Sequence, residues 1–573
     1  MNRMFDEHLI RNVRSLNGTW RFLTDPEANG EVRGYTTTLP YNAMEVYAPS
    51  LWNTELGLLE YEGVAWYERE FESKGGCVRL SFGAVMTEAK VYLDGELLGS
   101  HYGGFSAFSF IVNSLAAGHH TLTVRVDNRF NADSIPHAKV DWYHYGGIVR
   151  DVTLEELSGI TVTSCHMEYT LSTNYDKAEV VFHTKLRSAC SEKTISPLRI
   201  RLNGQTLCET EVELGGYEEK IIVSEPVTVP DIHLWDPADP FLYELTVNTA
   251  TDDLIDRVGF REIKVEKGQI LLNGNKLEIR GVCRHEEHPD WGFAFPEKLM
   301  KRDLDIVLDM GCNAIRGSHY PNSRSFVDRL DSAGMLFWSE IPIWGGGYSA
   351  DDLANPKVVE RGLAMIREME DQYYNHPSII IWGVHNEIDS SCEAAYKMTE
   401  SYMAELRANG GNRLLTHASN HSGTDICFNL DDIICINHYS GWYGGNVKSW
   451  VKVISDITER KKSLGVSEKP LIFSEFGAAA IYGNHTFDNI KWSEEYQANL
   501  FEFCLKLFHE SSDVNGCFIW QFCDIRTSRE MGNDRARSFN NKGILNEYRK
   551  PKAAYFTVRK LYREFAAENG DKK

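Results

Sequence analysis

Apolar and polar residues alternate with a period of two over most of the first 262 residues. Up to about residue 157, short apolar runs such as GTWRFL, CVRLSFGAV and HTLTVRVDN are separated by turn signals, and VYLDGELL places Asp94-Gly95 between two runs. An Asp-Gly pair in that position predicts a tight β-hairpin. We therefore expect residues 1–157 to form a jelly-roll-like antiparallel β-sandwich. Residues 158–262 repeat the pattern on a smaller scale, which predicts an immunoglobulin-like β-sandwich.

The pattern changes at about residue 263, where short apolar runs begin to alternate with longer segments that have apolar residues at helical spacing. Eight runs are strand candidates: 278–284, 313–319, 335–340, 378–384, 414–419, 433–439, 470–476 and 517–522. Eight β–α repeats predict a (β/α)8 TIM barrel over residues 263–573. A doubly wound sheet is the alternative, but it usually has fewer strands. The predicted fold class is thus multidomain, with two β-sandwiches followed by an α/β barrel.

Nearly every strand candidate ends in a residue that can take part in chemistry. These residues are Arg284, His319, Glu340, Glu387, Ser419, Tyr439, Glu475 and Trp520. In a barrel of this type, the carboxyl ends of the strands form the active site. The sequence therefore predicts one polar mouth at that end of the barrel.

Two of these strand ends carry glutamates, in WGVHNE (382–387) and FSEFG (473–477). They follow the fourth and seventh strands, which lie across the mouth from each other, and glycoside hydrolysis requires two facing carboxyl groups. Enclosure by apolar walls such as Trp382 should raise the pKa of Glu387, which suits a proton donor. Asn386 beside it could bind a sugar 2-hydroxyl. Glu475 should stay ionised, with help from a tyrosine hydroxyl such as that of Tyr439.

Composition narrows the class of protein. The formal net charge of −22 over 573 residues, without a strong Lys/Arg cluster, argues against a nucleic-acid partner. No run approaches ~18 apolar residues, so we expect no membrane span. The N-terminus lacks the apolar core of a secretory signal, and the 12 cysteines are scattered, which favours free thiols in the cytoplasm. In RHEEH (284–288), the histidines lack the H-E-x-x-H spacing, so we expect a polar cluster, with no metal and no cofactor.

The chain resembles glycoside hydrolase family 2 along nearly its whole length. NAIRGSHYP (313–321) with DSAGMLFW (331–338) is similar to the first family signature, WGVHNE to the acid/base signature, and SEFG to the nucleophile segment. LNGTWRF (16–22) and GFREIKV (259–265) resemble the opening of the first sandwich and the junction with the barrel. The resemblance implies a retaining mechanism with Glu387 as acid/base and Glu475 as nucleophile. We also expect a homo-oligomer, either a dimer or a tetramer.

Within the family, three further segments resemble those of bacterial β-glucuronidases: DWYHYGGI (141–148), INHYSGWY (436–443) and SFNNKG (538–543). The resemblance implies that the following residues bind substrate: Asp141, His319, Asn386, Asn437, Tyr439, Tyr443, Trp520, Asn540 and Lys542. Lys542 supplies a cation and Asn540 an amide donor, which together favour a carboxylate at sugar C6. The loop 527–540 is longer than in the familiar bacterial enzymes. The family's arginine before the motif therefore aligns with either Arg535 or Arg537.

The expected function is an exo-acting β-glucuronidase that hydrolyses terminal β-D-glucuronides on small molecules or oligosaccharides. A β-galacturonidase or a broader hexuronidase is the alternative. Its substrates carry the same C6 carboxylate for Asn540 and Lys542 to bind, but they differ in configuration at C4, and no motif in the sequence distinguishes the two configurations. A β-galactosidase is less well supported, because its neutral substrate has no carboxylate for Asn540 and Lys542 to bind. A non-enzymatic carbohydrate-binding protein is disfavoured because both glutamates, Asn386 and Trp520 are present.

Overall fold

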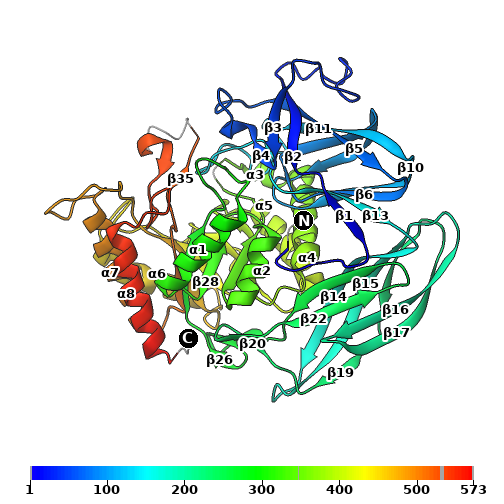
Figure 1. The fold of residues 1–573 in the computed structure, drawn as a ribbon. Helices are drawn as coiled ribbons and strands as arrows, with labels where there is room; N and C mark the ends of the chain where they lie inside the picture. The colour runs from blue at the N-terminus through cyan, green and yellow to red at the C-terminus, as the bar shows by residue number, and fades with distance from the viewer. Residues whose placement is uncertain (1–2, 346, 529–534, 571–573) are drawn as a thin grey trace.

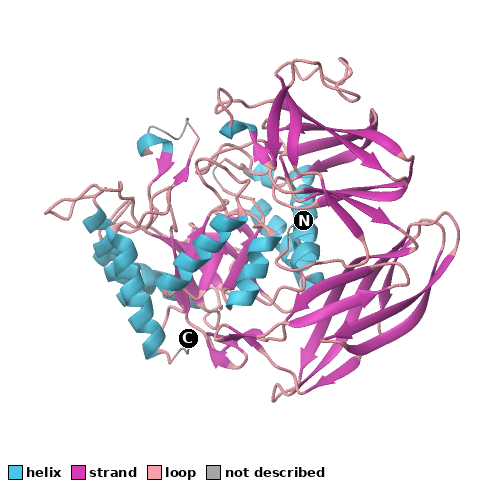
Figure 2. Cartoon of the chain, viewed as in Figure 1, coloured by secondary structure: helices cyan, strands magenta, loops and turns pink. Residues whose placement is uncertain are grey.

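The chain folds into two β-sandwiches that pack against one side of a (β/α)8 barrel (Figures 1 and 2). The structure is a computed structural model and describes residues 3–345, 347–528 and 535–570. Mainly β architecture in the N-terminal half and a closed parallel barrel in the C-terminal half confirm the predicted fold class. Within the described residues, no helix combines the length and apolar character needed to cross a membrane.

The first sandwich consists of two larger antiparallel sheets and one small sheet, with strand orders β1-β13-β6-β10, β3-β2-β5-β11-β8-β9 and β4-β12-β7. The strands of the larger sheets are β1 (Asn12–Ser15), β2 (Gly18–Asp25), β3 (Met44–Ala48), β5 (Val64–Ser73), β6 (Gly76–Phe82), β8 (Glu88–Leu93), β9 (Glu96–Tyr102), β10 (Phe108–Leu115), β11 (Gly118–Asp127) and β13 (Val152–Leu157). The small sheet pairs β4 (Ser50–Leu51) and β7 (Val85–Met86) with β12 (Gly147–Ile148). Inward-facing apolar residues of the two larger sheets form one buried core.

The predicted hairpin in the first sandwich is confirmed between β8 and β9. Asp94 and Gly95 both have positive φ, at 52° and 89°. The left-handed conformation at both central positions is what a two-residue hairpin turn with right-handed strand twist requires. Leu93 pairs with Glu96 directly across this turn.

The second sandwich has two four-stranded antiparallel sheets with a core of their own. One contains β14 (Ile160–Leu171), β15 (Lys177–Ser188), β18 (Glu219–Val223) and β19 (Val227–Pro230), and the other β16 (Thr194–Leu202), β17 (Gln205–Leu214), β22 (Tyr243–Asn248) and β23 (Asp253–Val258). Strand β15 alternates buried and more exposed residues along its whole length. This alternation is the period-two pattern of a sheet that has one face on the core.

The barrel is closed, and each of its eight strands falls on a predicted run. They are β27 (Ile279–Arg284), β28 (Ala314–Gly317), β29 (Leu336–Glu340), β30 (Ile379–Asn386), β31 (Leu414–Ser419), β32 (Ile434–Asn437), β33 (Leu471–Phe476) and β34 (Gly516–Ile519). The surrounding helices are α1 (Glu297–Met310), α2 (Arg324–Ala333), α3 (Ala350–Leu353), α4 (Pro356–Tyr373), α5 (Glu393–Asn409), α6 (Trp450–Ser463), α7 (Glu494–Glu510) and α8 (Ala553–Glu568). Every residue of β30 is buried, which explains its unbroken apolar run.

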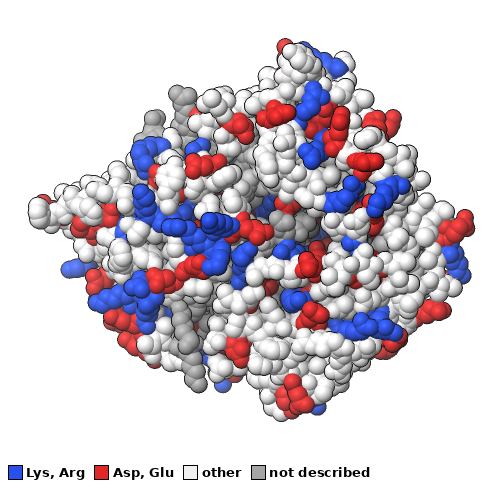
Figure 3. Space-filling model, viewed as in Figure 1, with Lys and Arg blue, Asp and Glu red and all other residues white. Residues whose placement is uncertain are grey.

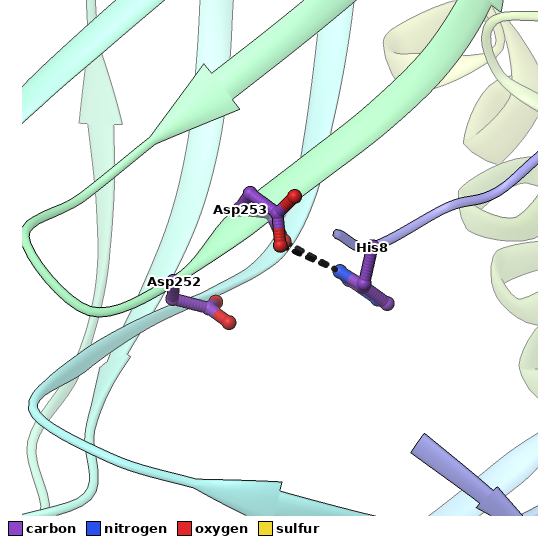
Figure 4. Close-up of side chains that lie close together, drawn as sticks. All are labelled: His8, Asp252 and Asp253. Atoms are coloured by element: carbon purple, nitrogen blue, oxygen red, sulfur yellow. Dashed lines mark hydrogen bonds and ion pairs between the residues drawn. The ribbon is translucent and has the colours of Figure 1, made fainter. Parts of the chain in front are cut away.

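The N-terminal segment is held against the second sandwich by charged groups (Figure 4). Asp253 accepts hydrogen bonds from the backbone N–H groups of Leu9 and Ile10, and its carbonyl oxygen lies 2.5 Å from His8 Nδ1. Asp252 forms a two-point ion pair with Arg11. These contacts anchor the N-terminal segment to the second sandwich.

Charged side chains of both signs occur over all three domains on the face shown in Figure 3, and they intermingle there. A nucleic-acid interface would need a positive stripe or patch. The absence of a nucleic-acid partner stays a prediction that rests on the net charge of −22.

Candidate active site

A cavity of about 600 Å³ lies at the carboxyl ends of the barrel strands. Nine of the predicted site residues line it: Asp141, His319, Glu387, Asn437, Tyr439, Tyr443, Glu475, Trp520 and Lys542. The other two, Asn386 and Asn540, lie immediately behind the lining and are hydrogen-bonded to residues that form it. The structure thus brings together all eleven residues, although the first and the last, Asp141 and Lys542, are 401 positions apart in the chain.

Glu475 is held by two strong donors. Its Oε1 accepts a hydrogen bond from Arg316 Nη1 at 3.0 Å, and its Oε2 accepts one from the Tyr439 hydroxyl at 2.7 Å. His319 Nε2 lies 3.6 Å from Oε1, and its ring stacks on Trp520. Burial, and after it the charge of Arg316, lower the pKa of His319 well below its usual value.

Arg316 is the centre of this network, although sequence reasoning did not single it out. Its guanidinium is fully buried, pairs with Glu340 at 2.9 Å and Glu475 at 3.0 Å, and stacks on Trp338. It also donates to Asn386 Oδ1 at 2.8 Å. The signal that could have revealed it is an arginine inside the otherwise apolar strand β28. A buried cation there requires carboxylate partners, and Glu340 at the end of β29 is one of them.

Glu387 follows β30 directly and occupies an unusual backbone conformation, with a φ of 54°. Its N–H donates to Ala418 O, and Asn437 Nδ2 donates to its Oε1 at 2.7 Å. Gly345 packs so closely that a Cβ there would lie 1.6 Å from Glu387 O. The loop after β29 therefore buttresses this strained position, and strain of this kind is concentrated at functional sites.

The orientation of the two amides near Glu387 is fixed by their neighbours. Ser474 Oγ donates to Asn437 Oδ1 at 2.7 Å, so the Asn437 amide nitrogen must face Glu387 and Asn386. Asn386 Oδ1 accepts from both Arg316 and Asn437. Asn386 Nδ2 is buried with no hydrogen-bond partner among the described residues. It is therefore a donor in need of an acceptor, as the predicted contact with a sugar 2-hydroxyl requires.

Both glutamates have a raised affinity for a proton. Burial and the nearby Glu387 raise the pKa of Glu475 to about 8, against the opposing pull of Arg316 and Tyr439. Burial also raises the pKa of Glu387. When two carboxyl groups interact, their protons dissociate in two steps, and the two apparent pKa values describe the pair and not either residue alone. The bound proton therefore belongs to the coupled pair, and the charged donor Arg316 acts against it by favouring the ionised form of Glu475.

The expectation for Glu475 thus changes in one respect. The predicted tyrosine is present, but the hydroxyl of Tyr439 does not by itself keep the pKa of Glu475 in its ordinary range. The physical reasons are the burial of the Glu475 carboxyl group and, second, the like charge of Glu387.

At the other end of the cavity, Lys542 is 2% exposed, and no described residue accepts a hydrogen bond from its ammonium group. The ammonium lies 5.0 Å from the Tyr443 ring and 5.7 Å from the Tyr439 ring. An ammonium group that faces two aromatic rings and forms no ion pair within 4 Å among the described residues is short of a direct counter-ion. This end of the cavity is therefore suited to bind a carboxylate.

Asp141 reaches the cavity from the loop between β11 and β12 of the first sandwich. It receives a two-point ion pair from Arg535, at 2.9 and 2.6 Å, and a hydrogen bond from Asn540 Nδ2 at 2.7 Å. Arg535 lines the cavity, whereas Arg537 pairs with Glu547. The structure thus decides between the two arginines in favour of Arg535; residues 529–534 of the same loop lie outside the described part of the chain.

The RHEEH segment distributes its side chains among separate partners. Glu286 pairs with Arg150, Glu287 accepts a hydrogen bond from Tyr145, and His285 meets Tyr320. These contacts agree with the predicted polar cluster.

Comparison with known proteins matches this geometry to one family. Residues 263–567 match "Glycosyl hydrolases family 2, TIM barrel domain", and residues 160–261 match "Glycosyl hydrolases family 2". The chain belongs to glycosyl hydrolases family 2. It is therefore a glycoside hydrolase, as the paired glutamates indicated.

Individual family 2 relatives cover almost the entire chain. The crystal structure of a β-galacturonidase from Eisenbergiella tayi bound to galacturonate is 35% identical, with a TM-score of 0.92 over 98% of this chain and 99% of that one. The Ruminococcus gnavus β-glucuronidase structure is 26% identical, with a TM-score of 0.87 over 98% and 99%. A curated Bacteroides fragilis β-glucuronidase is 28% identical over 96% of this chain and 81% of its own length.

Proposed function

We propose that this family 2 enzyme is a retaining, exo-acting β-glucuronidase that removes terminal β-D-glucuronic acid from small-molecule or oligosaccharide conjugates. The observation that carries the proposal is the buried Lys542 ammonium, which lines the cavity without a hydrogen-bond acceptor among the described residues. A uronic acid carboxylate would supply the missing partner. A neutral hexoside offers no such partner, so it gains nothing from this cation.

In the proposed reaction, Glu387 protonates the glycosidic oxygen while Glu475 attacks the anomeric carbon. The bond to the aglycone breaks as the glycosyl–Glu475 ester forms. Glu387 then removes a proton from water, which attacks the ester and releases the sugar with its configuration retained. Arg316 and Tyr439 hold the attacking oxygens of Glu475 in place, and Asn386 Nδ2 is the donor for the 2-hydroxyl.

A β-galacturonidase is the second candidate, because the Eisenbergiella tayi relative at 35% identity carries that name, while the β-glucuronidases are 25–28% identical. Glucuronic and galacturonic acid share the C6 carboxylate and differ only in the orientation of the 4-hydroxyl. Both candidates therefore use Lys542 in the same way.

A panel of aryl glycosides tests the proposal on purified protein. The β-glucuronide is expected to be hydrolysed with the highest kcat/KM, ahead of the β-galacturonide, and the β-glucoside and β-galactoside should be at least a hundredfold poorer. A β-galactoside or β-glucoside preferred over both uronides would sink it. Proton NMR of the first product formed should show the β-anomer; the α-anomer would mean inversion.

Two further expectations belong to the same proposal. The 12 cysteines are free thiols, mostly buried, which supports the proposed cytoplasmic location. We also propose a homo-oligomer, a dimer or tetramer, which light scattering coupled to size-exclusion chromatography can test.

A further inference from the structure

A buried ion pair lies directly behind the segment that carries Lys542. Asp524, in the loop between β34 and β35 (Ile525–Arg526), and Lys552, immediately before α8, are both 0% exposed and lie 2.8 Å apart. Neither residue lines the cavity. Because a buried ion pair rarely adds net stability compared with apolar residues, its presence here calls for another explanation.

The pair holds the residues on both sides of Lys542. Asp524 Oδ1 accepts from Gly543 N at 3.0 Å, and its Oδ2 accepts from Asn541 Nδ2 at 3.1 Å. Lys552 Nζ donates to Asn541 O at 3.1 Å and to Ala480 O at 2.7 Å. Two of these hydrogen bonds hold the backbone on either side of Lys542, at Asn541 O and Gly543 N, and a third holds the Asn541 side chain.

Residues 541–543 are packed against the Asp524–Lys552 pair and cannot move closer to it. A Cβ on Gly543 would lie 2.2 Å from Asp524 N, so only glycine permits the close approach. Lys542 O accepts a hydrogen bond from Gln521 N, and Lys542 N donates to Asn540 Oδ1. With its backbone tied on all sides, Lys542 keeps only its side chain free to enter the cavity.

We propose that Asp524 and Lys552 are positioning residues for uronate recognition, which act by holding residues 541–543 so that the Lys542 ammonium meets the sugar C6 carboxylate. This inference rests on the proposed function. Hydrogen bonds to charged groups are stronger than neutral ones, which suits a clamp that must resist the pull of a bound anion. A site that is loose by about 1 Å loses much of its selectivity.

The test compares two ligands that differ at C6, uronic isofagomine and isofagomine. Their dissociation constants are measured by calorimetry for the wild type, for Lys552→Met, and for Lys550→Met as the matched control. Lys550 belongs to the same basic stretch but is exposed. Lys552→Met should reduce the preference for the uronic ligand at least tenfold, or about 1.4 kcal/mol. The affinity for isofagomine should stay within threefold, and Lys550→Met should change neither.

Each other outcome has a definite meaning. A wild type with no preference for uronic isofagomine would overturn the proposed function itself. A normal wild-type preference that Lys552→Met leaves intact would overturn only the positioning role, as would an equal loss of affinity for both ligands. If circular dichroism shows that Lys552→Met is unfolded, the double variant Lys552→Met/Asp524→Asn, which removes both buried charges, is measured against the same criteria.

Discussion

Replacing Glu475 by glutamine should abolish turnover and, at the same time, stabilise the protein at alkaline pH. The pKa of Glu475 is raised from an ordinary 4.5 to about 8. Because the folded state binds this proton more tightly than the unfolded state does, the contribution to stability is fully present below pH 4.5. It is lost as the pH rises toward 8. Glutamine has no proton to lose, so the variant escapes this loss.

The size of the effect follows from the pKa shift. One pKa unit corresponds to about 1.4 kcal/mol, so the full shift is worth at most about 5 kcal/mol, of which about 3.5 kcal/mol is lost between pH 5 and pH 8. Glu387 shares the same proton, so we assign ~2–4 kcal/mol to the substitution. With an unfolding entropy of about 2.1 cal/mol/K per residue over a barrel of roughly 300 residues, this is a shift of ~3–6 °C.

The assay is the melting temperature of Glu475→Gln minus that of the wild type, measured by calorimetry at pH 5, 6, 7 and 8. The difference should grow by ~3–6 °C from pH 5 to pH 8, whatever its sign at pH 5. Glu468→Gln, at an exposed position of the barrel, is the control and should show no such trend. A difference that is constant with pH, or that falls as the pH rises, would refute the reasoning about the shared proton.

Three further substitutions test separate parts of the site. Glu387→Gln should lower kcat on an aryl β-glucuronide by about 10²–10⁴-fold and remove the alkaline limb of the pH profile of kcat/KM; a normal alkaline limb would contradict its role as the acid. Lys542→Met should lower kcat/KM for the glucuronide about 10–150-fold, which corresponds to the loss of one charged hydrogen bond, and should change kcat/KM for the glucoside less than threefold. Equal losses for the two substrates in steady-state assays would exclude a contact between Lys542 and the uronate carboxylate. Ser474→Ala frees the Asn437 amide to rotate, so kcat should fall roughly tenfold at unchanged KM, and Ser474→Thr should restore it; an unaltered kcat would show that the Ser474–Asn437 bond is dispensable.

The barrel strands could be predicted from sequence because each is a short apolar run buried on both faces, as in β30. The polar residues at the strand ends could also be predicted to form one site, because a barrel brings the carboxyl ends of all its strands to one face. Glu387 and Glu475 could therefore be predicted as a facing pair from the sequence alone.

Other parts of the site depend on contacts that local sequence patterns do not carry. Arg316 gains its role only because Glu340 and Glu475, on two other strands, both reach it. The ion pair between Asp524 and Lys552 joins residues that lie on either side of residues 538–543 in the sequence. The choice of Arg535 over Arg537 required the position of Asp141, almost 400 residues earlier. Each is a long-range electrostatic pairing, which only the folded chain defines.

The junction between the first sandwich and the barrel contributes residues to the cavity in which the sugar would bind. On a uronic acid the 4-hydroxyl is next to C5, which carries the carboxylate, so it lies close to the group that binds that carboxylate. Asp141 and Arg535 line the same cavity as Lys542, and both oxygens of Asp141 are already engaged by Arg535 and Asn540. Because Asp141 is held in one orientation, its remaining lone pairs point in fixed directions, and an equatorial and an axial hydroxyl cannot use them equally well. We therefore expect the preference between glucuronide and galacturonide to depend on this ion pair, whereas the requirement for a carboxylate depends on Lys542.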